Sequence, residues 1–186
     1  LIKKEIASIN GLLKTIDNSF DNAVNLIANC SGKVIILGVG KSGLIGKKIA
    51  ATFSSLGTPA LFVHAVEAMH GDLGIISSQD LCIFLSYSGK SDEVIKVIRF
   101  IAKIGVKIIS ITGDGESNLA RKSDIHLNLY VNEEADPLGL APTSSSTTML
   151  VLGDALAICI AAKKGFSKKD FYQLHPGGSL GAQLRN

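Results

Sequence analysis

Five short apolar runs, separated by segments with helical features, constrain the fold of this chain more than any other feature. Apolar runs of this length, bounded by glycine and turn residues, are typical of strands buried on both faces. Because strands and helices alternate, we expect an α/β fold: a doubly wound, five-stranded parallel sheet flanked by helices, with ligands beyond the carboxyl ends of the strands. The predicted strands are Lys33–Leu37, Ala60–His64, Leu81–Leu85, Val106–Ile111 and Ile125–Tyr130.

The predicted helices lie between these strands and at both ends of the chain. Apolar residues at helical spacing indicate two helices within residues 1–30, with a break near Asp17–Ser19. Residues 65–75 are expected to be irregular. Because no linker or low-complexity segment divides the chain, we expect one domain, residues 1–186, with an α/β core at 33–186. The later helices are predicted at Leu44–Leu56, about Asp92–Ile104, near Leu119, from about Ser144 to Lys163, and at Ser167–Leu174.

Composition limits the core and the partners. Apolar residues make up 46% of the chain and aromatic residues only 5%, so the core must consist of Ile, Leu, Val and Ala. The net charge of +3 is mild and the basic residues are spread out, which argues against nucleic-acid binding but suits a small anionic substrate. The N-terminus is charged from the start, so no signal peptide is visible, and a cytoplasmic protein is expected.

One apolar stretch and two of the cysteines are also consistent with a cytoplasmic protein. Met149–Ala162 is too short for a membrane span and contains Asp154, which we interpret as a buried, hydrogen-bonded carboxylate; no membrane partner is expected. Cys82 and Cys159 lie in apolar runs and are expected to be buried, reduced thiols.

The first chemistry-bearing segment is Gly38-Val39-Gly40-Lys41-Ser42-Gly43, between a predicted strand and a predicted helix. It matches the dinucleotide pattern G-x-G-x-x-G, but that site needs an acidic residue at the end of the next strand, where His64 stands instead. We prefer a loop that holds an anion or a sugar with Gly40, Ser42 and the Lys41 cation; a plain tight turn is the alternative.

The segment Ser86-Tyr87-Ser88-Gly89-Lys90-Ser91 follows the third predicted strand. Its hydroxyls at Ser86, Ser88 and Ser91 converge on a helix N-terminus, where free N–H groups favour an anion, so it can hold a phosphate. Ordinary helix capping is the alternative. Six consecutive hydroxyl residues, Thr143–Thr148, open the longest helix and offer either a cap or donors to a sugar phosphate.

Acid and base candidates lie in loops, where functional sites concentrate. His64, Glu67, His70 and Asp72 lie in one segment, Glu133 and Glu134 precede an apolar loop, and His175 stands before Pro176-Gly177-Gly178. The pattern His64-x-x-Glu67-x-x-His70 could also hold a metal, although its spacing differs from that of a helical zinc motif.

Several of these motifs together resemble the SIS (sugar isomerase) domain of arabinose-5-phosphate isomerases, a flavodoxin-like α/β fold. The resemblance extends from about Val34 to Leu184. Its most specific parts, besides the two Gly/Ser turns, are His70-Gly71-Asp72-Leu73-Gly74, Pro137-Leu138-Gly139-Leu140-Ala141-Pro142-Thr143, Gly153-Asp154-Ala155-Leu156-Ala157 and His175-Pro176-Gly177-Gly178.

The resemblance implies interconversion of D-arabinose 5-phosphate and D-ribulose 5-phosphate, an early step toward the lipopolysaccharide sugar Kdo, with no required cofactor. It also implies a homodimer or homotetramer with sites between subunits, and the two regulatory CBS domains that usually follow are not in this chain. By the same resemblance Lys41, Glu93, Glu134 and His175 are catalytic, and His70 contacts substrate and can act as acid or base. His64 matches a position where zinc binds as an inhibitor. The implied substrate contacts are Gly40, Ser42, Gly57, Thr58, His70, Ser86, Ser88, Ser91 and Thr143.

The chemistry of such an isomerase fits these residue types. Moving a proton between adjacent carbons through an enediol needs a carboxylate base, for which we favour Glu134 over Glu93, and a cation such as Lys41 beside the developing charge. Ring opening suits His175 or His70. Asp136 replaces the family's usual Cys, and an added carboxylate there is expected to raise the pKa of Glu134 or shift substrate preference.

Three alternatives remain open from the sequence. The chain could be a SIS isomerase of a hexulose or sedoheptulose phosphate. It could be a non-catalytic sugar-phosphate sensor, although a sensor needs no acid/base set. The third alternative is a dinucleotide-binding oxidoreductase.

Overall fold

Five strands form one parallel sheet in the computed structural model, which describes residues 1–177. The strand order is β2-β1-β3-β4-β5, and every pairing is parallel. The inner strands β1 and β3 are buried at every residue, because helices cover both faces of the sheet. The predicted doubly wound sheet is therefore confirmed. The strands are β1 (Val34–Gly38), β2 (Ala60–His64), β3 (Leu81–Leu85), β4 (Lys107–Thr112) and β5 (Ile125–Asn128).

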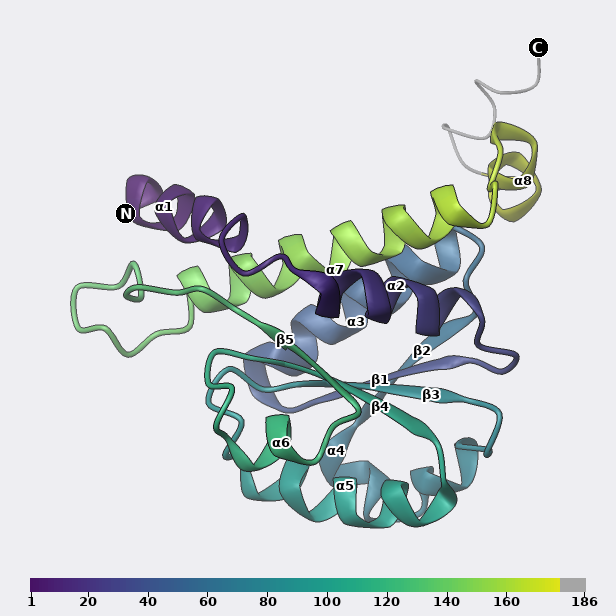
Figure 1. The fold of residues 1–186 in the computed structure, drawn as a ribbon, viewed down its shortest axis with the longest axis horizontal. Helices are drawn as coiled ribbons and strands as arrows, with labels where there is room; N and C mark the ends of the chain where they lie inside the picture. The colour runs from purple at the N-terminus through teal and green to yellow at the C-terminus, as the bar shows by residue number, and fades with distance from the viewer. Residues whose placement is uncertain (178–186) are drawn as a thin grey trace.

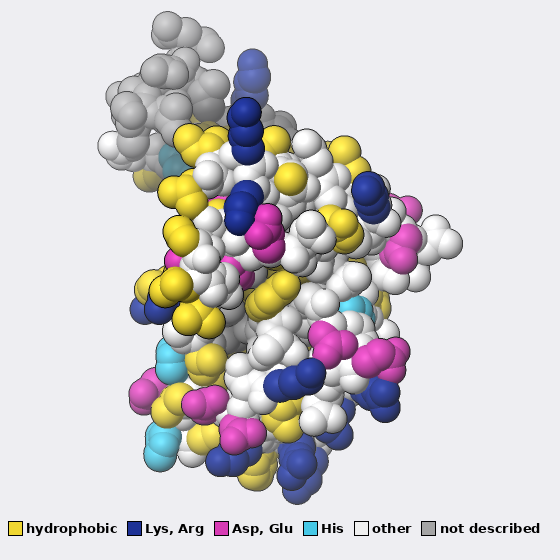
Figure 2. Space-filling model, turned by 90° about the vertical axis from the view of Figure 1, so that its left-hand side faces the viewer, with side chains coloured by type: hydrophobic (Ala, Val, Ile, Leu, Met, Phe, Trp, Pro, Cys, Tyr) yellow, Lys and Arg dark blue, Asp and Glu magenta, His cyan; other side chains and the backbone are white. Residues whose placement is uncertain are grey.

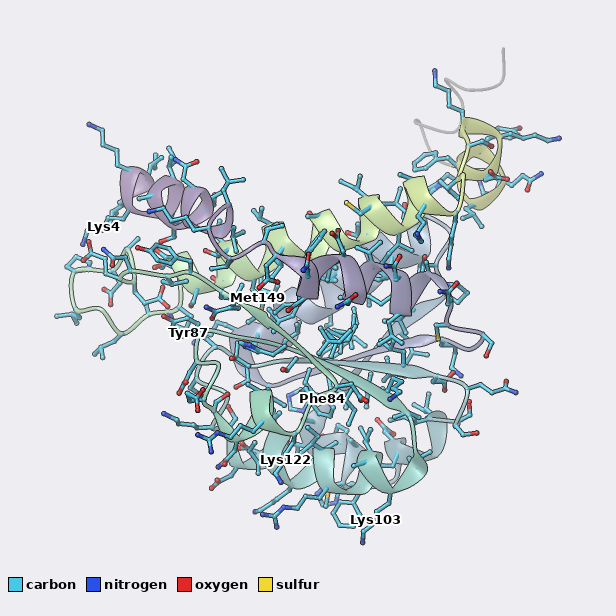
Figure 3. The ribbon with its side chains drawn as sticks, in the orientation of Figure 1. Lys4, Phe84, Tyr87, Lys103, Lys122 and Met149 are labelled. Atoms are coloured by element: carbon cyan, nitrogen blue, oxygen red, sulfur yellow. The ribbon has the colours of Figure 1, made fainter. Side chains whose placement is uncertain are left out.

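The helices form two layers around the sheet (Figure 1). One face carries α2 (Asn18–Ala28), α3 (Gly40–Ser55) and α7 (Ser144–Lys163), and the other carries α4 (Ala65–Ala68), α5 (Asp92–Ile104) and α6 (Asn118–Arg121). Each layer has its own apolar cluster, with Phe53 in the first and Phe84 in the second (Figure 3 labels Phe84). Helix α1 (Ile2–Leu12) packs on α7, and α8 (Lys168–Leu174) follows the end of α7.

Most boundaries agree with the predictions to within one or two residues, but two segments differ. Helix α3 begins at Gly40 rather than Leu44. Glycine within the helix lets it approach the sheet, since a Cβ on Gly46 would lie 3.0 Å from the Phe62 ring. Gly40 has φ of +54°, a conformation that glycine adopts readily. The segment expected to be irregular contains α4 and a short 3-10 helix, η1 (Asp72–Ile75).

Helix α7 differs from the sequence predictions at Asp154 and Cys159. By length and composition it is, within residues 1–177, the one helix that could cross a membrane; half of its most apolar window is buried in the fold, mainly against α1, α2 and α3. Asp154 is not buried but partly exposed, with its carboxylate 2.6 Å from the Lys48 ammonium. Cys159 is exposed, whereas Cys82 is buried as expected. Because α7 is apolar on nearly all sides, its sequence could not show which side faces the core.

Candidate active site

The carboxyl ends of β1 and β3 lie side by side, because the two strands pair in parallel. In the order β2-β1-β3-β4-β5 the connections after these two strands leave toward opposite faces, which opens a crevice between their turns. Figure 2 looks onto this edge of the sheet and shows acidic and basic side chains interspersed with neutral ones.

The turn after β1 brings Lys41 and Ser42 to this crevice. Val39 is the N-cap residue of α3 and gives no side-chain hydrogen bond, so side chains do not cap the first N–H groups of the helix. The Lys41 side chain is exposed and lines the pocket described below. The structure thus brings Gly40, Lys41 and Ser42 to the crevice, where the sequence predicted them.

The turn after β3 presents the three predicted serines together. Ser86 is buried; its hydroxyl lies 3.2 Å from the Ser91 hydroxyl and accepts a hydrogen bond from the Gly89 N–H. Ser88 Oγ accepts from the Lys90 N–H at 3.2 Å. Ser91 is the N-cap residue of α5 but makes no side-chain cap bond, so the first amides of that helix remain available.

Gly89 fixes the shape of this turn. Its φ is +62°, and a Cβ there would overlap the side chain of Ser117. The turn is also braced by the Lys90–Asp114 ion pair (3.2 Å). Only glycine therefore fits between this turn and the connection that follows β4.

Glu134 reaches the crevice from the loop between β5 and α7. Its Oε2 accepts hydrogen bonds from the Thr143 N–H (2.8 Å), the Thr143 hydroxyl (3.1 Å) and the Ser145 N–H (3.2 Å). Burial raises the pKa of this carboxyl group, but the hydrogen bonds from Ser145 and Thr143 outweigh burial and hold the pKa below the ordinary glutamate value. Thr143 also accepts from the Ala135 N–H, so its hydroxyl is occupied within the loop.

These elements enclose a pocket of about 210 Å³. Two of its side chains were not singled out from the sequence, Tyr87 and Met149 (Figure 3). Tyr87 lies within the serine-rich motif and could have been noticed there, whereas only the packing of α7 brings Met149 to the pocket. Burial and the negative charge of Glu134 raise the pKa of Tyr87. The lining residues are Lys41, Ser42, Tyr87, Glu134, Gly139, Leu140, Pro142, Ser145, Ser146 and Met149.

The other candidates at this edge lie around the pocket rather than in its wall. Glu93 is exposed in the first turn of α5, and His70 is exposed after α4. His64 caps α4, accepting the Val66 N–H at its Nδ1 (3.3 Å), and lines a more open hollow beside Lys41. Among residues 1–177 no three His, Cys, Asp or Glu side chains form a group that could hold a metal ion, so the pattern from His64 to His70 does not form one here.

His175, Gly57 and Thr58 lie at the opposite edge of the sheet, away from the other candidate residues. His175 Nε2 is 2.8 Å from the hydroxyl of Ser55, the last residue of α3, and its ring stacks on Phe171. Lys41 stands at the beginning of the same helix, about 20 Å away at 1.5 Å per residue. The rest of the His-Pro-Gly-Gly motif, from Gly178 on, lies outside the described residues, as does the end of the resemblance at Leu184.

Gly57 and Thr58 belong to the same remote group. Gly57 has φ of +80° and lies against the Phe166 ring, and Thr58 is buried with its hydroxyl 3.5 Å from the Lys164 ammonium. We call Gly57, Thr58 and His175 the amino-edge group, and the residues at the carboxyl ends of the strands the carboxyl-edge group.

Asp136 does not act on Glu134 as expected. Its Oδ2 accepts from the Leu140 N–H (2.8 Å) and the Ala141 N–H (3.0 Å), so the carboxylate is turned toward its own loop. The pKa of Glu134 is lowered rather than raised. Hydrogen bonds from the same loop amides hold the pKa of Asp136 below its ordinary value.

Known proteins resemble both the sequence and the fold. The "Arabinose 5-phosphate isomerase KdsD" of Shigella flexneri is 50% identical over 91% of this chain and 52% of its own length. The protein of the same name from Francisella tularensis is 50% identical over 97% of this chain and 56% of its own. The chain thus spans about half the length of the curated relatives it matches. A solved structure from E. coli CFT073, in complex with arabinose 5-phosphate, has a TM-score of 0.91 and 41% identity, and covers 94% of this chain and 93% of that one.

The match to a domain family includes both turns of the crevice. The SIS domain family matches residues 26–159, which contain the sheet, the serine-rich turn, Lys41 and Glu134. Because this match covers most of the chain, the chain belongs to the SIS domain family.

Proposed function

We propose that this chain is the isomerase domain that interconverts D-arabinose 5-phosphate and D-ribulose 5-phosphate. The observation that carries the proposal is the convergence of Lys41 and Glu134 on one pocket beside the serine-rich turn. The similarity to arabinose 5-phosphate isomerases, and to a structure in complex with that sugar phosphate, supports this substrate over other phosphosugars.

The serine-rich turn is proposed to hold the phosphate. Ser86, Ser88 and Ser91 offer hydroxyls, and the first amides of α5 offer N–H groups and the positive end of the helix dipole. Fixing the phosphate at one end of a five-carbon chain places the carbonyl end toward Lys41 and Glu134.

Glu134 is proposed to move the proton between the two carbons. Its lowered pKa keeps it ionised at neutral pH, and because its hydrogen bonds converge on Oε2, we assign Oε1 as the oxygen that takes the proton. It would remove the proton from C2 of the open-chain aldose and return it to C1, while the hydroxyl proton at C2 passes to the C1 oxygen. Lys41 would stabilise the enediolate charge, and Glu93 is the second candidate for the base.

Ring opening is proposed to use a histidine, and the geometry points to a second copy of the chain. Because His175 lies at the amino edge, it can join Lys41 only if another copy presents that edge to the pocket. Exposed apolar side chains support such an assembly, on α1 (Ile2, Ile6) and on the pocket loop (Leu138, Leu140). We therefore propose a homodimer or homotetramer; light scattering that finds only a monomer at micromolar concentration would contradict it.

The remaining proposals concern cofactors and setting. No cofactor is required, because the reaction is redox-neutral within one molecule. Zinc is proposed to bind His64 as an inhibitor. Because Nδ1 accepts the Val66 N–H, Nε2 carries the proton of the neutral ring, so zinc binding would have to displace this hydrogen bond. Kdo synthesis in the cytoplasm is the setting that the resemblance implies.

A direct assay tests the function. Protein that a chelator has freed of metal ions is incubated with arabinose 5-phosphate, and the formation of ribulose 5-phosphate is measured. We expect turnover that Lys41→Ala reduces strongly. Turnover of a hexulose or sedoheptulose phosphate but not of arabinose 5-phosphate would replace the proposed substrate, and binding of arabinose 5-phosphate without any turnover would indicate a sensor.

A further inference from the structure

Asp136 closes the loop that precedes α7. One carboxylate oxygen, Oδ2, accepts two backbone hydrogen bonds, from Leu140 (2.8 Å) and Ala141 (3.0 Å). The Asp136 carbonyl oxygen accepts a third, from the Gly139 N–H at 3.0 Å, and Gly139 has φ of +67°. The loop from Asp136 to Ala141 is therefore closed by three hydrogen bonds to one residue, two of them to its side chain.

This loop forms one wall of the candidate active site. Gly139 and Leu140 line the pocket that also contains Lys41 and Glu134. Leu138 and Leu140 are both 78% exposed, so apolar packing contributes little to the shape of the loop. The hydrogen bonds to Asp136 are thus the main interactions that set where the wall stands.

Two separate carboxylates hold the loop that precedes α7. Glu134 accepts hydrogen bonds from Thr143 and Ser145, where the loop joins the helix, and Asp136 accepts them from Leu140 and Ala141, at the tip of the loop. Loss of the tip contacts would leave the hydrogen bonds to Glu134 in place. The position of the loop tip and the position of Glu134, the proposed general base, can therefore be changed independently.

We infer that Asp136 is a positioning residue that fixes the pocket wall and thereby sets the affinity for the sugar phosphate. The inference rests on the proposed function for its substrate. A cysteine at this position could not replace the carboxylate, because a thiol is a weak acceptor and cannot hold two N–H groups in this way. An asparagine could, through its carbonyl oxygen.

Three substitutions test this role: Asp136→Ala, Asp136→Cys and Asp136→Asn. Loss of two hydrogen bonds to a charged acceptor is expected to raise KM about tenfold in the Ala and Cys variants. Because Glu134 keeps its own contacts, kcat should change by less than about threefold. Asp136→Asn should keep KM close to that of the original protein, and Leu140 and Ala141 should exchange their amide hydrogens faster in the Ala variant but not in the Asn variant.

Glu133→Ala is the matched control, because it removes a carboxylate from the same segment that pairs with Lys4 instead of the loop. An unchanged KM in both Ala and Cys variants, or an Asn variant as impaired as Ala, would overturn the inference. If the original protein does not turn over arabinose 5-phosphate, the proposed function fails while amide exchange still decides the loop: unchanged exchange at Leu140 and Ala141 in Asp136→Ala refutes the role of Asp136.

Discussion

The carboxyl-edge and amino-edge groups differ in the contacts that hold them. Lys41 and Glu134 line a pocket and lie beside uncapped helix amides, which are features of a binding site. Gly57, Thr58 and His175 instead lie against the end of α3 and the aromatic rings of Phe166 and Phe171. Because α3 separates the groups by its own length, no side-chain motion within one chain can unite them.

The comparison shows that sequence motifs identify the residue types of a site, but not whether one copy of the chain brings those residues together. The sequence motifs place both groups in one function, and the fold places them at opposite edges of one sheet. A site shared between copies of the chain satisfies both statements. The predictions below therefore test each edge separately, beginning with the largest expected effect.

The largest effect is expected from Glu134→Gln. Glutamine keeps an acceptor for the Thr143 and Ser145 N–H groups but cannot take a proton, so kcat should fall by about a thousandfold, the range typical of a lost general base. Thermal denaturation should show little change in Tm. Full turnover in this variant would exclude Glu134 as the base and leave Glu93 as the candidate.

The pH profile adds an independent test of the same residue. The folded-state pKa of Glu134 is lowered, so the carboxylate remains a base as pH falls until that lowered pKa is reached. The acidic limb of kcat/KM should thus have its midpoint below the ordinary glutamate value of about 4.3. The same sign applies to stability: the contribution of Glu134 is present above its unfolded pKa and lost as pH falls through the folded pKa. A further limb at about 6 to 6.5 would belong to the substrate phosphate or to a histidine and not to Glu134.

The next effect concerns the amino edge. His175→Ala should lower kcat about a hundredfold through loss of an acid/base group. Mixing this inactive variant with Lys41→Ala should restore up to about a quarter of the original activity if each site uses both edges from different copies of a dimer. Mixtures that stay inactive after subunit exchange would place His175 outside the site.

A smaller effect is expected at the serine-rich turn. Gly89→Ala introduces a Cβ against the Ser117 hydroxyl and strains a residue with positive φ, which should displace the serine hydroxyls and raise KM for arabinose 5-phosphate about tenfold. Gly105→Ala is the control, because Gly105 also has positive φ but open space around its Cβ position. Equal effects of the two substitutions would show that only backbone strain is involved.

A loss of stability rather than of activity is expected for Gly57→Ala. The new Cβ would lie 2.6 Å from the Phe166 ring, and the positive φ adds strain, so the free energy of unfolding should fall by about 1–3 kcal/mol. Gly165→Ala has a similar φ without a clash and should cost less. Thermal or urea denaturation compares them; a larger loss in Gly165→Ala would show that contact with Phe166 is not tight.

Much of the site could be predicted from local patterns, and the misses have physical reasons. The serines after β3 and Lys41 after β1 were predictable because carboxyl ends of parallel strands meet at one edge. Met149 was not, because its place depends on how α7 lies over the crevice. Asp136 was interpreted through its sequence neighbour Glu134, whereas its contacts are with amides four and five residues further along the loop.

The sequence by itself determined the order of strands and helices and the residue types of the two turns, because hydrophobic period, glycine positions and helix caps act over a few residues. The tertiary structure alone decided which side of α7 is buried, where the 136–141 loop stands, and that His175 lies at the edge away from Lys41. These features depend on contacts between segments distant in sequence, and no local pattern encodes the direction in which such segments meet.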